Sequence, residues 1–256
     1  MIVPQPDTNL MLKGDCIDWM KELPNESIDM VLCDLPYGTT QNRWDEVVPF
    51  DKLWEQYNRI IKEDGIIVLT ASQPFSSMLL MSNREMFKHE WIWIKNKGSN
   101  FANTVREPFK EHEHVLIFAN KKWTYNKQMQ ERTGSGLARV KYDFMNETKS
   151  DNYRKFERKG RRTVPKLRVP ASIQKFNTEQ GLHPTQKPVA LMEYLIKTYT
   201  NEGDLVLDNC MGSGTAGVAC KNLNRDFIGI ELDEKYFKIA KERIENTTSF
   251  HGKVKA

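Results

Sequence analysis

The chain has 256 residues, of which 39% are apolar and 10% aromatic, and a net charge of +4. This composition excludes a disordered chain and suits one large domain that carries an insertion. No apolar run reaches the ~20 residues of a membrane span, and the N-terminal stretch MIVPQPDTNL does not resemble a secretory signal, so we expect a cytoplasmic protein.

Strand-like and helix-like segments alternate over residues 1–120. Apolar runs such as SIDMVLCD predict short buried strands at residues 9–15, 27–34, 65–71, 89–95 and 114–123. Residues 50–62 are predicted to form a helix, because their apolar side chains recur at helical spacing. This apolar face consists of Leu53, Trp54, Tyr57, Ile60 and Ile61.

Residues 121–180 lose this alternation and are rich in basic residues. From Lys121 to Pro170 there are 15 Lys or Arg and 5 Asp or Glu, a net charge of +10, which leaves a net charge of −6 for the rest of the chain. A basic segment on an otherwise acidic protein indicates a polyanion partner, although a solvated insertion has the same composition.

The alternation returns after residue 180. Helices are predicted at residues 187–199, 215–223 and 233–245, and strands at 204–208 and 226–232, with Asp233 as the N-cap of the last helix. Strands that alternate with helices predict an α/β fold with a doubly wound, mostly parallel sheet. We therefore expect residues 1–120 and 181–256 to form two halves of one domain, with 121–180 inserted between them.

The stretch VLDNCMGSGTAG, residues 206–217, runs from a predicted strand through a glycine-rich turn into a helix. Gly212 and Gly214 allow close approach of a ligand, and Glu231 at the next strand end can bind ribose hydroxyls. The spacing also fits a dinucleotide site. However, Asp208 lies where a pyrophosphate would bind, and a carboxylate there favours a ligand with a cationic end, such as S-adenosylmethionine.

The stretch LCDLPYG, residues 32–38, ends a predicted buried strand. The carboxylate of Asp34 and a main-chain carbonyl can accept the two N–H groups of an amine on a nucleic-acid base. Pro36 stiffens this turn, and Tyr37 offers a ring on which a flipped base can stack. By itself, the tetrapeptide favours an ordinary turn at the end of a strand, because short motifs recur by chance.

Together these motifs resemble the DNA amino-methyltransferases, which transfer a methyl group from S-adenosylmethionine to adenine N6 or cytosine N4. Residues 14–38 are similar to the start of the β-class members, and HPTQKP, His183 to Pro188, is similar to the segment before their cofactor half. The order of the motifs is also that of the β class. The resemblance implies a Rossmann-like fold, double-stranded DNA as substrate, and a bacterial or phage protein near the nucleoid. It also suggests a second copy and a cognate restriction endonuclease as partners.

The resemblance implies roles for matching residues. Asp34, Leu35, Pro36 and Tyr37 would form the catalytic motif. The cofactor would be bound by Asp15 and Cys16 at its adenine, Glu231 at its ribose, Thr185 and Lys187 at its carboxylate, and Asp34, Asp208, Gly212, Ser213, Gly214 and Thr215 around its methionine part. DNA phosphates would be bound by Lys155, Arg158, Lys159, Arg161, Arg162, Lys166 and Arg168.

One position departs from the family pattern, because Leu35 stands where Pro is common. An initial Asp is found more often in the adenine enzymes, so we expect transfer to adenine N6 by base flipping, without a covalent enzyme intermediate. A cytosine-N4 or RNA methyltransferase, a nicotinamide-dependent dehydrogenase and an inactive DNA-binding homologue remain as alternatives.

Other conspicuous residues are expected to be structural. Cys16, Cys33, Cys210 and Cys220 have no CxxC spacing and are read as core or turn residues of a reducing compartment. Trp91 and Trp93 are expected in the core. His112 and His114 would share one face of a strand, but without a third ligand at recognisable spacing we expect no metal site.

Overall fold

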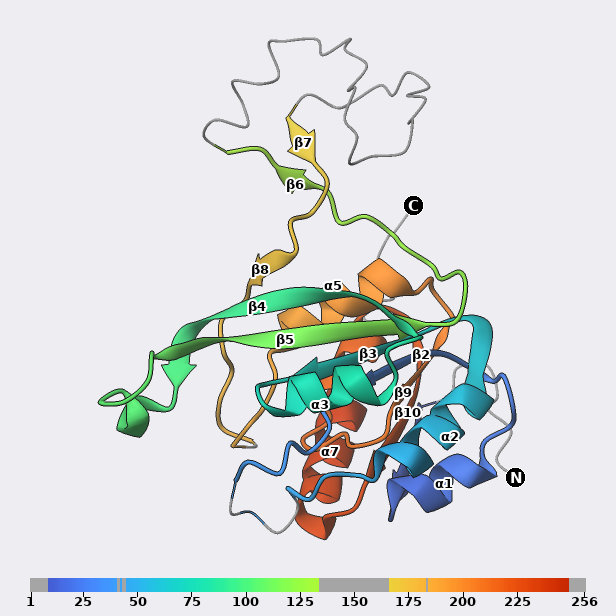
Figure 1. Cartoon of the computed structure of the whole chain (residues 1–256). Helices are drawn as coiled ribbons and strands as arrows, with labels where there is room; N and C mark the ends of the chain where they lie inside the picture. The colour runs from blue at the N-terminus through green and yellow to red at the C-terminus, as the bar shows by residue number, and fades with distance from the viewer. Residues whose placement is uncertain (1–8, 41, 43–44, 134–165, 183, 249–256) are drawn as a thin grey trace. The chain divides into compact units, whose positions relative to one another are not determined.

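The computed structural model describes residues 9–40, 42, 45–133, 166–182 and 184–248 (Figure 1). The chain divides into two compact units. One comprises Met1–Asn126 with Ser172–Ala256, and the other is Lys127–Ala171. The smaller unit thus begins and ends within the basic segment.

The larger unit contains an eight-stranded sheet in the order β1-β10-β9-β2-β3-β5-β4-β8. The strands are β1 (Asn9–Lys13), β2 (Ile28–Cys33), β3 (Ile61–Ala71), β4 (Phe87–Ser99), β5 (Lys110–Ala119), β8 (Ile173–Lys175), β9 (Leu205–Asp208) and β10 (Asp226–Glu231). All neighbouring strands are parallel except that β5 is antiparallel to both β3 and β4. The doubly wound, mostly parallel sheet expected from the sequence is confirmed.

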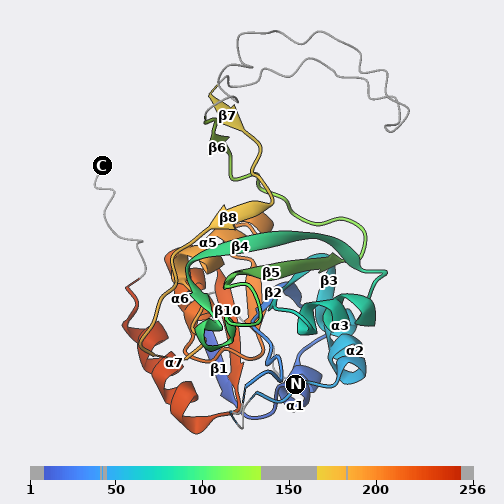
Figure 2. The same ribbon diagram turned by 60° about the vertical axis from the view of Figure 1, so that its left-hand side comes forward.

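Helices cover both faces of this sheet (Figures 1 and 2). One face carries α1 (Cys16–Glu22), α2 (Phe50–Ile60) and α3 (Phe75–Ser82), and the other carries α5 (Val189–Tyr199), α6 (Thr215–Asn222) and α7 (Glu234–Asn246). A 3₁₀ turn, η1 (Phe101–Asn103), lies in the hairpin between β4 and β5. The sequence analysis missed α1 and α3. None of the described helices is long and apolar enough to cross a membrane.

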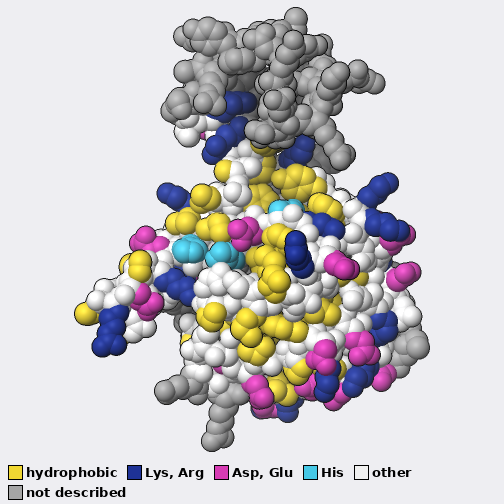
Figure 3. Space-filling model, in the orientation of Figure 1, with side chains coloured by type: hydrophobic (Ala, Val, Ile, Leu, Met, Phe, Trp, Pro, Cys, Tyr) yellow, Lys and Arg dark blue, Asp and Glu magenta, His cyan; other side chains and the backbone are white. Residues whose placement is uncertain are grey.

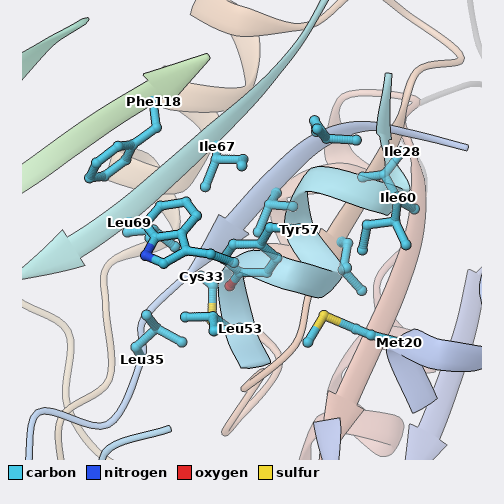
Figure 4. Packing of buried hydrophobic residues seen from close by; sticks show 14 of the residues in the cluster. Met20, Ile28, Cys33, Leu35, Leu53, Tyr57, Ile60, Ile67, Leu69 and Phe118 are labelled. Carbon is cyan, nitrogen blue, oxygen red and sulfur yellow. The ribbon is translucent and has the colours of Figure 1, made fainter. Parts of the chain in front are cut away.

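Each face of the sheet has its own hydrophobic core. In the first core, Leu53 and Tyr57 of α2 pack with Met20 of α1 and with Cys33 and Ile67 of the sheet (Figure 4). The predicted apolar residues are therefore buried, but the helix ends at Ile60, and Ile61, which was predicted on its apolar face, begins β3. Burial of a side chain of this size contributes about 1.5–3 kcal/mol.

The second core lies between the sheet and the helices α5 to α7. Trp91 and Trp93 of β4 are buried in it, as predicted, and contact the α5 side. Side chains of a strand alternate between faces, so Met30 and Leu32 of β2 also point to this side. The same alternation, continued one residue past the end of β2, places Asp34 at the end of this face.

Two aspartates cap helices with the same geometry. Asp15 Oδ1 accepts hydrogen bonds from the backbone N–H of Ile17 and Asp18 at the start of α1, at 2.8 and 3.1 Å. Asp233 Oδ1 does the same at α7, at 2.8 and 3.1 Å, as the sequence predicted. Such caps fix the point at which the chain turns from strand into helix.

In the smaller unit, β6 (Gln130–Glu131) pairs antiparallel with β7 (Leu167–Arg168). The backbone N–H of Arg132 donates to the carbonyl of Lys166 at 2.8 Å. Lys166 and Arg168, two of the residues predicted to bind DNA, are exposed here. Lys155, Arg158, Lys159, Arg161 and Arg162 lie outside the described residues.

Candidate active site

The carboxyl ends of four adjacent parallel strands meet at one edge of the sheet. In the order β1, β10, β9, β2, these ends carry or precede Asp15, Glu231, Asp208 and Asp34. The chain continues from β2 to β3 on one side and from β9 to β10 on the other, so the strand order reverses between β9 and β2. In open α/β sheets, ligands bind at such a reversal. The fold thus gathers the acids that the sequence singled out.

Asp208 ends β9 and is only 5% exposed. Its Oδ1 accepts a hydrogen bond from the backbone N–H of Cys210 at 3.2 Å. Burial is the main cause that raises the pKa of Asp208 to about 7; the hydrogen bonds from Cys210 and Cys33 lower it, and the acidic neighbours Asp34 and Glu231 contribute to raising it. A cation bound here would lower this pKa and stabilise the carboxylate.

The glycine-rich turn has the backbone that the motif predicts. Gly212 and Gly214 have positive φ angles of 51° and 76°. A Cβ at Gly214 would lie 3.0 Å from the Cβ of Ala240, so α7 packs too closely for a larger residue. Glu231 accepts the backbone N–H of Gly212 and of Asp233, both at 2.8 Å. Its carboxylate is thereby oriented at the end of β10, and burial raises its pKa.

Ser213 and Thr215, which were expected near the cofactor, contact α7. Arg243 Nη1 donates to the carbonyl of Ser213 at 3.1 Å and to the hydroxyl of Thr215 at 3.0 Å. Both residues are buried. In this structure they tie the glycine-rich turn to α7.

A groove of about 560 Å³ lies beside the start of α1. It is lined by Asp15, Ile17, Asp18, Lys21, Pro49, Lys52, Glu55 and Gln56. Asp15 is exposed, and its Oδ1 is occupied by the helix cap. The groove therefore adjoins the residue expected to contact an adenine ring.

The thiols of Cys16, Cys33 and Cys210 lie together below this edge. Cys210 exchanges hydrogen bonds with both other thiols. The bond with Cys210, together with burial, raises the pKa of Cys16. The bond with Cys16 lowers the pKa of Cys210, but the bond with Cys33 and burial outweigh it and raise this pKa. All four cysteines are free. The fold thus gathers three residues that are scattered in the sequence, and their environment suits the structural role predicted for them.

Asp34 follows β2 and receives donors from three parts of the fold. Its Oδ1 accepts the hydroxyl of Tyr37 at 2.8 Å and the hydroxyl of Thr70 from β3. Its Oδ2 accepts Lys187 Nζ at 2.6 Å. A carboxylate has about four accepting positions, two on each oxygen. Three are filled by the protein, and one remains on Oδ2.

The rest of the tetrapeptide is anchored by packing. Leu35 is 3% exposed and joins the first core, which fixes the turn without the proline that is common in the family. The Tyr37 ring stacks on Phe75 with centroids 5.1 Å apart. Asp45 closes the following loop, because its carboxylate accepts the backbone N–H of Gly38, Thr39 and Thr40 at 2.6–2.9 Å.

Lys187 was expected at the carboxylate of the cofactor, but in this structure it joins two acids. It is 6% exposed, and its Nζ also lies 3.4 Å from Glu113 Oε2. The other oxygen of Glu113, Oε1, forms an ion pair with Lys95 of β4. Burial opposes the charge on Lys187, but Asp34 and Glu113 outweigh it and raise its pKa. The sequence analysis missed Glu113, Lys95 and Thr70.

The remaining candidates are Thr185, two residues before Lys187, and the two histidines of β5. Thr185 is exposed. The rings of His112 and His114 lie 5.6 Å apart, and His114 Nδ1 is 2.9 Å from Glu90 Oε2. Figure 3 shows histidine side chains among hydrophobic and acidic ones on this face. Within the described ranges, no third ligand joins these histidines to form a metal-binding group.

A family model described as DNA methylase matches residues 28–242, which include the β2 end, the Lys187 segment and the glycine-rich turn. The chain belongs to this DNA methylase family.

Named relatives agree with the DNA methylase assignment. Type II methyltransferase M.HpaI of Haemophilus parainfluenzae is 30% identical over 94% of this chain and 75% of its own length. DNA adenine methyltransferase YhdJ of Escherichia coli K12 is 27% identical over 93% of this chain and 83% of its own length. The crystal structure of the M1.HpyAVI–SAM complex is 28% identical, covers 91% of this chain and 98% of that chain, and superposes with a TM-score of 0.63.

Proposed function

We propose that this DNA methylase transfers a methyl group from S-adenosylmethionine to the N6 of adenine at a specific site in double-stranded DNA. The observation that carries the proposal is the Asp34 carboxylate, oriented by three donors and retaining one accepting position at the switch between β9 and β2. The relatives named as type II and DNA adenine methyltransferases support the same reaction.

The residues of the β1, β10 and β9 ends fit this cofactor. Asp208 is a buried carboxylate among acidic groups and suits a cationic ligand. Glu231 is oriented to accept ribose hydroxyls, and the groove beside Asp15 has room for an adenine ring. When bound, the cofactor supplies an electrophilic methyl group on a sulfonium.

The catalytic turn acts on the target amine. Asp34 and the main-chain carbonyl of Leu35 accept the two N–H groups of a flipped adenine, which orients the nitrogen lone pair. The negative charge of Asp34 also stabilises the positive charge that develops on the nitrogen. Tyr37 provides a wall for the base. No cysteine nucleophile is required, and the four thiols are left to packing.

The basic segment is proposed to face DNA. Its cations would neutralise phosphates and position the enzyme, while base contacts set the recognition sequence. Replacing Arg161 and Arg162 together, or Lys166 and Arg168 together, should weaken binding and reduce the dependence of the binding constant on salt. An unchanged salt slope in both double variants would contradict phosphate contact.

Incubation with methyl-labelled S-adenosylmethionine and unmethylated duplex DNA, followed by digestion to nucleosides, tests the reaction. Label in N6-methyladenine is the expected result. Label in N4-methylcytosine would retain the family and overturn the inference from Asp34. Absence of label, with cofactor still bound, would favour the RNA methyltransferase or the inactive homologue.

The proposal extends to two protein partners, a restriction endonuclease and a second copy of this chain. Because relatives are named type II methyltransferases, we propose that a cognate restriction endonuclease accompanies this enzyme. We also propose that the methyltransferase acts at the nucleoid. We further propose a homodimer. Light scattering of the purified protein tests the dimer, and methylated DNA that resists one restriction endonuclease identifies the partner.

A further inference from the structure

The buried charges beside Asp34 form a continuous row. Lys95, Glu113, Lys187 and Asp34 alternate in sign, and neighbouring members are in ion-pair contact. Lys95 lies in β4 and Glu113 in β5, whereas Asp34 follows β2 and Lys187 precedes α5. The side chains of Lys187, Lys95 and Glu113 are 6%, 9% and 11% exposed, whereas that of Asp34 is 23% exposed. The row thus runs from the protein interior to the edge of the site.

The strand register explains how the row forms. Trp91 and Trp93 of β4 and Val115 and Ile117 of β5 point to the α5 face. Continuing this alternation to the carboxyl edge places Lys95 and Glu113 on the same face. Trp93 pairs with Glu113, which brings Lys95 diagonally next to it. Lys187, just before α5, reaches this edge from the face of the sheet that α5 covers.

Buried charges of this kind are costly unless each is paired. With four groups of alternating sign, the row carries no net charge. Loss of the Glu113 charge would leave Lys187 with Asp34 as its only carboxylate and give the row a net positive charge. Lys187 would then be drawn more strongly to Asp34 Oδ2, which is the oxygen with the remaining accepting position.

We infer that Glu113 and Lys187 are positioning residues for Asp34. Lys187 fills one position on Oδ2, and Glu113 shares the ammonium group so that Oδ2 keeps its second position for the substrate amine. This inference rests on the proposed function of Asp34, and it assigns Lys187 to the catalytic turn rather than to the cofactor carboxylate.

Burial alone would raise the pKa of Glu113, but Lys187 and Lys95 outweigh burial and hold its pKa below the usual value. Glu113 is therefore an anion in the folded protein. Glu113→Gln keeps the size and shape of the side chain and removes only the charge.

Asp29→Asn is the matched control. Asp29 lies in β2 and accepts Lys62 Nζ at 2.6 Å and the backbone N–H of Leu205 at 2.9 Å. It is five residues before Asp34, at the opposite end of the strand. The control breaks a partly buried ion pair of similar length without touching the site.

The test measures the single-turnover methylation rate, the Kd of S-adenosylmethionine and the Kd of DNA for each variant. Glu113→Gln should lower the rate about 10- to 100-fold, because a small misplacement of a catalytic group has effects of this size. Both Kd values should stay within about twofold of wild type. Asp29→Asn should keep the wild-type rate.

A charge-balancing variant separates electrostatics from packing. Lys95→Met in the Glu113→Gln background restores the neutrality of the row, so the double variant should be faster than the product of the two single losses predicts. Strictly additive losses would indicate that the charge of Glu113 does not act through the row.

Lys187→Met tests the competing role. The inference is supported if the methylation rate at saturating S-adenosylmethionine falls while the cofactor Kd is unchanged. A cofactor Kd at least tenfold higher, with the saturated rate unchanged, would assign Lys187 to the cofactor and overturn it. A Glu113→Gln rate within twofold of wild type would also overturn it.

A spectroscopic readout keeps the test independent of activity. In protein with ¹³C-labelled aspartate, the Asp34 carboxyl signal should shift in Glu113→Gln and stay in place in Asp29→Asn. If the wild type methylates no DNA and the signal still shifts in this pattern, the proposed function fails and the positioning stands. An unshifted Asp34 signal in Glu113→Gln would overturn the positioning itself.

Discussion

Two carboxylates flank the point where β9 and β2 lie side by side, and the protein surrounds them differently. Asp34 is held by the ammonium group of Lys187 and by two hydroxyls. Asp208 is more deeply buried, accepts a backbone N–H, and has acidic groups as its charged neighbours. One carboxylate is paired with a cation of the chain, and the other is proposed to bind a cationic ligand.

The difference follows from what each group is proposed to bind. A neutral amine offers no charge, so the chain itself must hold and orient Asp34. A cationic cofactor brings its own charge, and a protein cation beside Asp208 would compete with it. Holding a carboxylate without a counterion destabilises the folded state until the ligand binds.

The largest effect is expected at Asp34. Asp34→Ala removes the acceptor of the target amine. The methylation rate should therefore fall by about 10²- to 10³-fold or more, as in other sites that lose a transition-state hydrogen bond. The cofactor Kd should be nearly unchanged. Single-turnover kinetics with labelled cofactor measures the rate, and calorimetry the Kd. A variant that retains turnover would show that Asp34 does not bind the amine.

Asp208→Asn should have the opposite pattern. The lost charge should weaken cofactor binding about 10- to 100-fold, since hydrogen bonds to charged groups contribute about 1.5–3 kcal/mol. At saturating cofactor, most of the methylation rate should return. The comparison breaks down if the saturated rate falls as far in this variant as in Asp34→Ala.

The same substitution should stabilise the cofactor-free protein. The folded pKa of Asp208, about 7, lies above the usual value of 3.8, so the folded state binds this proton more tightly than the unfolded state. The contribution of Asp208 to stability therefore falls as pH rises from about 4 to 7, by up to about 4 kcal/mol at 1.36 kcal/mol per pKa unit. Thermal unfolding should give Asp208→Asn a higher Tm than wild type at pH 8. This advantage should shrink towards pH 5.

The smallest effect is expected at the two helix caps, Asp15 and Asp233, which have the same geometry. Asp15→Ala and Asp233→Ala each remove a carboxylate that accepts two backbone N–H groups, and each should lower stability by about 1 kcal/mol. Only Asp15 also lines the groove beside α1. Cofactor affinity should therefore fall in Asp15→Ala alone. Equal affinities in the two variants would remove Asp15 from the proposed cofactor site.

Much of the fold could be predicted from the sequence because parallel strands buried on both faces are continuous apolar runs. The segments at β2, β9 and β10 were recognised in this way, and so were the amphipathic helix α2 and the Asp233 cap. The helices α1 and α3 are short and were missed. The antiparallel orientation of β5 depends on the hairpin after β4, whose geometry is not evident from residue types.

The residues of the candidate site also differ in whether the sequence reveals them. Asp34, Asp208 and Glu231 each stand at the end of a strand within a recognisable local pattern. Glu113 stands in the stretch EHEH, which was read for its histidines, although it continues the buried alternation with Val115 and Ile117. Its contact with Lys187 joins positions far apart in the chain. Such a pair depends on the tertiary fold, and the motif before α5 suggested a different partner.

The most direct test of this contrast is the number of protons released when S-adenosylmethionine binds. Calorimetry at pH 6.5 in buffers of different ionisation enthalpy measures it. Because Asp208 is largely protonated at this pH in the free protein and ionised beside a cation, wild type should release a large fraction of one proton. Asp208→Asn should release close to none, and Asp34→Ala should behave as wild type. Binding without proton release in the wild type would show that Asp208 does not receive the cationic end of the cofactor.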